Sequence, residues 1–261
     1  MDELIRIKNE GYAEYEDLLL KRDKLRKEAQ ILQGLYMAEF GDLITAVFQK
    51  KIDCIQKKKT IAFCQASINR GESVNQDELQ AHLKKEMQDY QKRLKEMVEE
   101  NEAAHQMTSI DDASLVRIKK LYRKMAKLIH PDINPQTKDT PELQGVWNLI
   151  QASYNANDLK ELEEAEVMLN QVLTKLGLGE TEIDIPDIQE KIKVLQEEII
   201  KIKTTNPYQY KYLLEDKDAV REKKETLNDE LKEYEEYEKE LGKYLEQLVT
   251  ENGITFIWRM K

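Results

Sequence analysis

A His-Pro-Asp tripeptide at residues 130–132 is the segment whose residue types and position could carry chemistry. It follows residues 118–129, which read as an amphipathic helix. Apolar side chains recur along one side at helical spacing: Ile118, Leu121, Tyr122, Met125 and Ile129. The opposite side carries bases and no acid: Lys119, Lys120, Arg123, Lys124 and Lys127. Pro131 ends the helix, because a proline drives the residue before it out of the helical region.

The charge pattern of this segment indicates binding to an acidic surface. Residues 115–131 contain no acid, although the whole chain has a net charge of −10. Lys and Arg supply charge steering and charge-assisted hydrogen bonds to an acidic partner. General nucleic-acid binding is disfavoured, because phosphate recognition needs a broadly positive face. The alternative interpretation is an ordinary helix stop in which Asp132 merely caps a turn.

The basic helix and the residues after it resemble the J-domain of the DnaJ family. In that family a basic second helix ends in His-Pro-Asp, and a loop and a third helix follow. Residues 143–155 are similar to that third helix, with Trp147, Ile150 and Tyr154 at its usual aromatic and apolar positions. The resemblance covers about residues 105–165, which is under a third of the chain.

Three features depart from the family pattern. The loop over 133–140 is slightly long. The short helix that normally opens the domain has no counterpart, and we expect the helical pattern over 78–104 to supply its packing surface. Residues 159–166 are acidic where the fourth helix of the family is usually basic.

The resemblance implies a partner and a set of contact residues. J-domains use the basic helix and the HPD segment to bind the ATPase domain of a DnaK-type heat-shock chaperone, and they stimulate its ATP hydrolysis. Carried over by position, the partner-binding residues are Lys119, Lys120, Tyr122, Arg123, Lys124, Lys127, His130, Pro131, Asp132 and Asn134. Trp147 should also lie near this contact, but we favour a core role for it.

Composition favours an all-α fold with long exposed helices. Charged residues make up 35% of the chain and aromatic residues 7%, which is unlike a strand-rich core. The N-terminus has no apolar stretch of signal-peptide length, and no run approaches the roughly 18 apolar residues of a membrane span. We therefore expect a cytoplasmic protein that makes no membrane contact.

No residue pattern indicates a catalytic site, a cofactor or a metal ion. Cys54 and Cys64 lie ten positions apart, which is neither a metal spacing nor a disulfide framework, so we expect small buried hydrophobic side chains. His82 and His105 have no second ligand at helical spacing and are predicted to lie on the surface. A Gly-rich phosphate loop, a Ser/His/Asp set and a paired-carboxylate site are all missing, so we predict that the protein is not an enzyme.

The pattern of helices and breaks predicts four segments. Residues 1–104 form an N-terminal helical hairpin, 105–176 a J-domain-like unit, 177–185 a linker, and 186–261 a C-terminal coiled-coil hairpin with a short apolar tail. The C-terminal hairpin should turn at residues 204–207, where Thr-Thr-Asn-Pro interrupts the helical period.

The predicted helices of these hairpins are long and carry narrow apolar seams. We expect helices over 2–33 and 42–69, separated at Gly34 and Gly41, and a third that begins near residues 75–77. The seam over 188–202 follows a 4-3-4-3 spacing: Ile188, Ile192, Leu195, Ile199 and Ile202. Seams of this kind pair either within one chain or between copies, so the sequence leaves open whether the protein forms a homo-oligomer.

Two functions follow from this pattern. The first is a J-domain co-chaperone that stimulates a DnaK-type chaperone, with helical arms that recruit an unknown client protein. The alternative is a coiled-coil scaffold protein whose J-like domain is inactive. A nucleic-acid binder that uses the basic helix is a weaker third candidate. The intact HPD segment favours the first.

Overall fold

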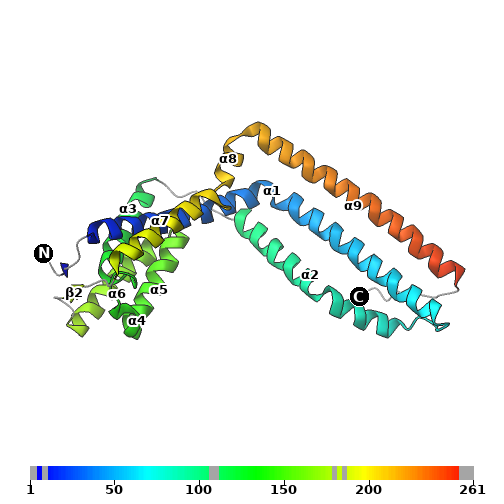
Figure 1. Cartoon of the computed structure of the whole chain (residues 1–261), viewed down its shortest axis with the longest axis horizontal. Coiled ribbons are helices and arrows are strands. Elements are labelled where there is room, and N and C mark those ends of the chain that lie inside the picture. Colours follow the sequence, from blue (N-terminus) through cyan, green and yellow to red (C-terminus); the bar gives the residue numbers. More distant parts are fainter. Residues whose placement is uncertain (1–4, 8–10, 106–111, 178–180, 184–186, 253–261) are drawn as a thin grey trace. The chain divides into compact units, whose positions relative to one another are not determined.

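The computed structural model describes residues 5–7, 11–105, 112–177, 181–183 and 187–252 (Figure 1). The predicted all-α fold is confirmed. The helices of the described residues are α1 (Tyr12–Asn69), α2 (Gln76–His105), α3 (Asp112–Ile129), α4 (Gln136–Asp139), α5 (Pro141–Ala156), α6 (Leu159–Leu176), α7 (Ile188–Thr204), α8 (Tyr210–Glu215) and α9 (Lys217–Glu251). Two short strands, β1 (Ile5–Ile7) and β2 (Thr181–Ile183), pair in parallel. The apolar tail over 254–261 lies outside the described residues.

The chain divides into two compact units that do not follow the predicted segments. Unit 1 comprises Met1–Ile31 and Thr108–Gln209, and unit 2 comprises Leu32–Met107 and Tyr210–Lys261. Helix α1 contributes residues to both units. The expected boundaries at 104 and 186 therefore differ from the division in the structure, because one long helix supplies a side of each unit.

Helix α1 is continuous where we expected two helices. It runs for 58 residues through Gly34 and Gly41. A glycine inside a helix costs only about 1 kcal/mol relative to alanine, which packing on neighbouring helices offsets. Gly41 also has a packing reason, since a β-carbon there would collide with the side-chain amide of Asn101 on α2. The glycine marks a close approach of two helices and not a break.

Unit 1 is built around a core shared by α3, α5 and α6. The apolar face predicted for the basic helix lies in this core, with Ile118, Met125 and Ile129 fully buried. Trp147 of α5 is 4% exposed and belongs to the same cluster, which confirms its core role. Helix α6 is capped by Asp158, whose side chain accepts the N–H of Glu161. Helix α4 occupies part of the segment expected to be a loop.

A second cluster of unit 1 joins the first turns of α1 to α7. Tyr12, Tyr15 and Leu19 of α1 pack with Ile133 and with the α7 seam. The seam residues of that cluster are Ile188, Ile192 and Leu195. The N-terminal part of α1 therefore lies against the segment that follows the His-Pro-Asp tripeptide.

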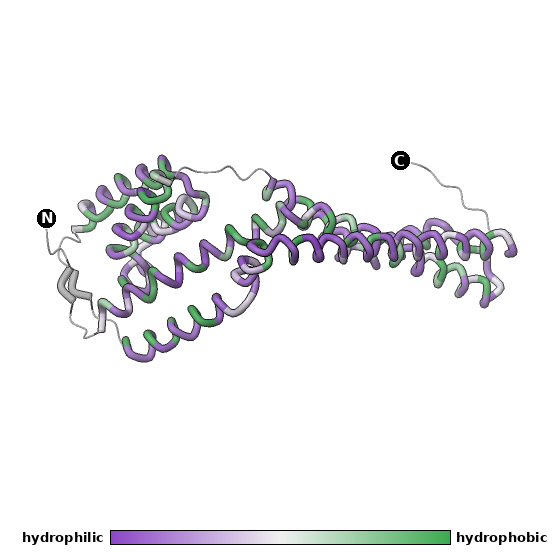
Figure 2. Tube along the Cα trace, turned by 90° about the horizontal axis from the view of Figure 1, so that it is seen from above, coloured by the Kyte–Doolittle hydropathy of each residue, from purple (hydrophilic) through white to green (hydrophobic). Residues whose placement is uncertain are grey.

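Unit 2 is a set of long helices in which α1 lies between α2 and α9 (Figure 1). Phe40 and Val47 of α1 pack with Leu227 of α9. Figure 2 shows hydrophobic positions recurring at intervals along otherwise hydrophilic helices, as the predicted seams require. The start of α2 was predicted correctly, because the Asn75 side chain accepts the N–H of Asp77 at 3.0 Å.

The predicted C-terminal hairpin is wrong. Helix α7 packs in unit 1, whereas α9 packs in unit 2 against the later part of α1. The seam over 188–202 was identified correctly, but its partner is the first part of α1 and not the last helix of the chain. A heptad pattern fixes which face is apolar and leaves the identity of the partner open.

By length and composition alone, α1 is the one helix of the described residues that qualifies as a candidate membrane span. Core helices of soluble proteins pass the same test, so this property carries little weight.

Candidate partner-binding site at the HPD turn

The HPD turn, which we define as His130, Pro131 and Asp132, is held by its own backbone and by Asn134. The N–H groups of Ile133 and Asn134 donate to the His130 carbonyl at 2.8 and 2.7 Å. The Asn134 amide donates to the carbonyl of Leu128 at 3.2 Å, and its oxygen accepts the N–H of Gln136 at 3.1 Å. These bonds satisfy the last carbonyls of α3 and fix the turn.

His130, which we predicted to bind the partner, is buried. The residue is 4% exposed, and its ring lies edge-on to Trp147 with the centroids 4.6 Å apart. The N–H of Asp132 donates to Nδ1 at 3.0 Å, so Nδ1 is the acceptor nitrogen. The proton of a neutral ring then sits on Nε2. Nε2 lies 3.4 Å from a carboxylate oxygen of Asp23 on α1.

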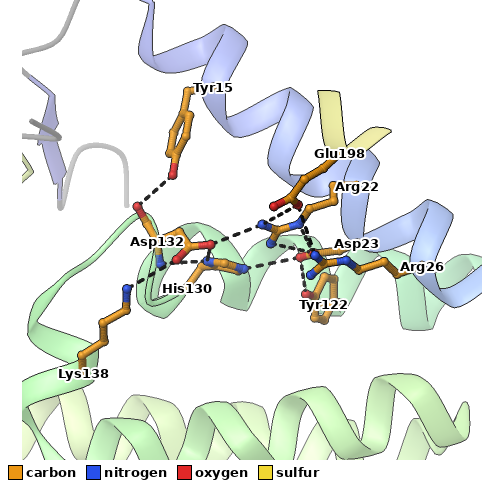
Figure 3. A network of polar contacts seen from close by, with 9 residues as sticks. All are labelled: Tyr15, Arg22, Asp23, Arg26, Tyr122, His130, Asp132, Lys138 and Glu198. Carbon is orange, nitrogen blue, oxygen red and sulfur yellow. Dashed lines mark hydrogen bonds and ion pairs between the residues drawn. The ribbon is translucent and has the colours of Figure 1, made fainter. Parts of the chain in front are cut away.

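Asp23 is the hub of a buried polar network (Figure 3). One of its oxygens accepts from Nε and Nη2 of Arg22 at 3.1 and 2.9 Å, and the other accepts from the Tyr122 hydroxyl at 2.8 Å. Burial tends to raise the pKa of this carboxyl. The hydrogen bond to His130 and the charge of Arg22 outweigh burial, and the pKa of Asp23 falls to about 2. Asp23 is therefore a buried anion.

The same network fixes the phenol of Tyr122. Burial and the neighbouring Asp23 carboxylate raise its pKa. Its ring stacks on Tyr154 with the centroids 3.9 Å apart. Tyr122 was predicted to contact the partner, but its 5% exposure makes it a core residue. Asn134, also predicted as a contact residue, is 5% exposed and supports the turn from inside.

Asp132 is the more exposed acid of the site, with 37% of its side chain accessible. Its carboxylate lies 3.4 Å from Nη1 of Arg22 and 3.5 Å from Nζ of Lys138. Its backbone carbonyl accepts the hydroxyl of Tyr15 on α1 at 3.3 Å. Arg22 also lies 3.8 Å from Glu198 of α7. The first part of α1 therefore contacts both the imidazole and the carboxylate of the HPD turn.

The basic face of α3 is partly covered by acids from elsewhere in unit 1. Lys127 pairs with Glu16 at 2.6 Å and Arg123 pairs with Asp17 at 2.9 Å, and both acids belong to α1. Lys124 pairs with Glu166 of α6 at 2.7 Å.

The two remaining bases of that face, Lys119 and Lys120, are exposed. The structure records no ion pair for them among the described residues. They differ from Arg123 and Lys124, which are also exposed but are paired with acids.

The structure thus brings together most of the predicted site and adds residues that we missed. Arg22 and Asp23 were treated as part of a charged coiled coil, as were Glu16 and Asp17. A signal was present for two of them, since Glu16 and Asp23 lie seven residues apart on one side of α1 and both are acids, as a basic helix and its HPD turn require. Nothing in one sequence identifies which distant helix such a face meets.

The packing surface expected from residues 78–104 comes instead from α1. Leu20 packs on the α3–α5–α6 core. Lys27 donates to the carbonyl of Tyr154 at 2.6 Å and lies over its ring at 3.7 Å. Helix α2 belongs to unit 2. The expectation that residues 78–104 supply this surface is therefore wrong, because the first part of α1 already packs there.

No group of His, Cys, Asp and Glu among the described residues is arranged to hold a metal ion. Cys54 and Cys64 are free and buried, as predicted, and burial raises the pKa of both thiols. His82 and His105 lie on the surface, also as predicted.

Comparisons with protein-family models, with curated proteins and with solved structures gave no match for this chain.

Proposed function

We propose that the protein is a J-domain co-chaperone that binds a DnaK-type chaperone and stimulates its ATP hydrolysis. One observation carries the proposal: a basic helix ends in an ordered HPD turn, and this turn is joined to a helix that packs on the same core. The proposal also rests on the family resemblance of residues 105–165. The helical arms of unit 2 would recruit a client protein.

The residues of the site have distinct roles in this proposal. Lys119 and Lys120 steer the acidic surface of the chaperone toward α3, since exposed charges act mainly on the association rate. Asp132 supplies the carboxylate that the partner contacts. His130 and Asn134 position Asp132 by holding the turn, and they are buried. The chain itself carries out no bond-making step.

The test is the steady-state ATPase rate of a DnaK-type chaperone with and without this protein. We expect stimulation by the wild type and its loss in Asp132→Asn. Asp139→Asn is the matched control, because Asp139 is an exposed carboxylate on α4, seven residues further along the chain. Equal stimulation by all three proteins would refute a role for the HPD turn.

A second candidate is a coiled-coil scaffold protein with an inactive J-like domain. A specific observation favours it: His130 is buried and Asp132 is paired within the chain, so the HPD turn already has partners. In that case the turn serves packing alone. Neither the wild type nor any variant that exposes the turn would then stimulate a chaperone.

A further inference from the structure

We infer that the first part of α1 is an autoinhibitory clamp over the HPD turn and the basic face of α3. The clamp segment is residues 12–31 of α1. This inference rests on the proposed function, because it concerns access of the chaperone to that site. It assigns a regulatory role to a helix outside the region of family resemblance.

The clamp segment covers the proposed contact site. The clamp segment places Asp23 on His130 and Arg22 on Asp132, at 3.4 Å in each case. It also pairs Glu16 with Lys127 and Asp17 with Arg123. Asp132, Lys127 and Arg123 are thus each already matched by a group of opposite charge on α1, and His130 faces a carboxylate. A partner that uses the same groups must compete with the clamp segment.

The second step concerns how the clamp segment meets the core. The α3–α5–α6 cluster of thirteen buried residues contains none from α1, and Leu20 packs on it as a half-buried neighbour. The segment also makes polar contacts to two members of the cluster, from Asp23 to Tyr122 and from Lys27 to Tyr154. Opening of residues 12–31 would break these contacts and expose the HPD turn, while the apolar contacts among α3, α5 and α6 do not involve the segment. A segment that can leave without unfolding its receptor is suited to gating.

The third step concerns what holds the clamp closed. Tyr12, Tyr15 and Leu19 anchor the segment to Ile133 and α7 through apolar contacts. The charged contacts grade from buried to exposed, since 10% of the Asp23 side chain but 70% of the Asp17 side chain is accessible. The exposed pair of Asp17 and Arg123 can be exchanged for a partner contact first, and the contacts of Glu16 and Asp23, which are largely buried, are released later. The structure shows the closed state.

The test uses the full-length chain with two neutralising substitutions. The clamp variant carries Glu16→Gln and Asp17→Asn, which remove both ion pairs to α3. The residues of the HPD turn and the bases of α3 are left unsubstituted. The control variant carries Glu14→Gln and Glu28→Gln. These residues also lie on α1, and their recorded contacts are with Gln196 of α7 and with Lys24 of the same helix. Both variants change the net charge equally.

Two measurements are made on each protein. Hydrogen exchange reports whether the amides of residues 12–31 and of the HPD turn open, with α9 as an internal reference. The ATPase rate of a DnaK-type chaperone reports access to the site. In the clamp variant we expect faster exchange in the segment and about threefold to tenfold greater stimulation at subsaturating concentration, the scale of losing one exposed and one half-buried ion pair. The control variant should match the wild type.

The outcomes separate this inference from the proposed function. Equal stimulation by the wild type and the clamp variant, with exchange showing that the segment has opened, overturns the clamp and leaves the co-chaperone function standing. Unchanged exchange in the clamp variant also overturns it, because the two pairs then do not hold the segment. No stimulation by any protein, with the segment open, overturns the proposed function itself.

Discussion

The substitution Asp23→Asn probes the centre of the polar network that joins α1 to the HPD turn. It keeps the size of the side chain and removes the negative charge. Arg22 and the Tyr122 hydroxyl then lose the carboxylate that they share. The amide keeps one acceptor oxygen where the carboxylate had two, so either Arg22 or the Tyr122 and His130 side loses its acceptor. We predict that unit 1 becomes less stable and that the loss depends on pH.

The magnitude follows from the pKa of Asp23. The fall from its ordinary value of 3.8 to about 2 corresponds to roughly 2 kcal/mol, at about 1.4 kcal/mol for each factor of ten. Removing one partner of a buried pair costs about 3–5 kcal/mol when the other charge is left alone. Arg22 keeps Asp132 and Glu198 within 4 Å. We therefore expect a loss of about 2–3 kcal/mol near neutral pH.

The sign of the pH dependence is fixed by the direction of the shift. A carboxyl whose folded pKa is depressed contributes stability above its unfolded pKa, and this contribution is lost as the pH falls through the folded value. The wild type should lose stability between about pH 4 and pH 2 from this group. The difference between wild type and Asp23→Asn should shrink over the same interval.

The assay is urea unfolding followed by Trp147 fluorescence, with Trp258 replaced by Phe so that one indole reports. Trp147 lies in the unit 1 core against His130, so the signal follows the unit under test. Asp139→Asn serves again as the exposed control and should change stability by less than about 0.5 kcal/mol. A loss below about 0.5 kcal/mol in Asp23→Asn, or a loss that does not vary with pH, would refute the reasoning.

Two further predictions concern charges elsewhere. Burial, helped by the charge of Lys119, lowers the pKa of Lys27 to about 8. Unit 1 should therefore gain stability as the pH rises above about 8, which a higher urea midpoint at pH 9.5 than at pH 7 would show. Lys27→Met should abolish that difference between the two midpoints. Glu238 accepts from Lys50 and Lys57 at 2.8 and 2.6 Å. Glu238→Gln should accelerate hydrogen exchange in α9 by a few-fold, because half-exposed pairs contribute about 0.5–1 kcal/mol, and unchanged exchange would show that they contribute nothing.

The local features of this fold could be read from the sequence. The apolar face of α3, its end at Pro131 and the core position of Trp147 all depend on residues within a few turns of one another. Periodicity and proline stereochemistry act at that range. The Asn75 cap was predictable for the same reason, since a short polar side chain bonds to the next turn of its own chain.

The errors concern which distant helices meet. Continuity through Gly34 and Gly41 depends on packing that offsets the glycine penalty, and Asn101 of α2 is part of that packing. The burial of His130 depends on Asp23, which lies more than a hundred residues earlier in the chain. The sequence of a narrow seam, or of a charged face, is the same whether that surface meets solvent, a partner or another helix of the chain. Such pairing is decided by tertiary packing.

The central claim is that the HPD turn is a chaperone contact held closed by α1. The most direct test is the stimulated ATPase rate of a DnaK-type chaperone with three proteins: wild type, the clamp variant (Glu16→Gln, Asp17→Asn), and the clamp variant with Asp132→Asn added. The account predicts that the clamp variant stimulates most, that the wild type stimulates less, and that the added Asp132→Asn removes the stimulation. Undiminished stimulation by the triple variant, or none by the clamp variant, would contradict it.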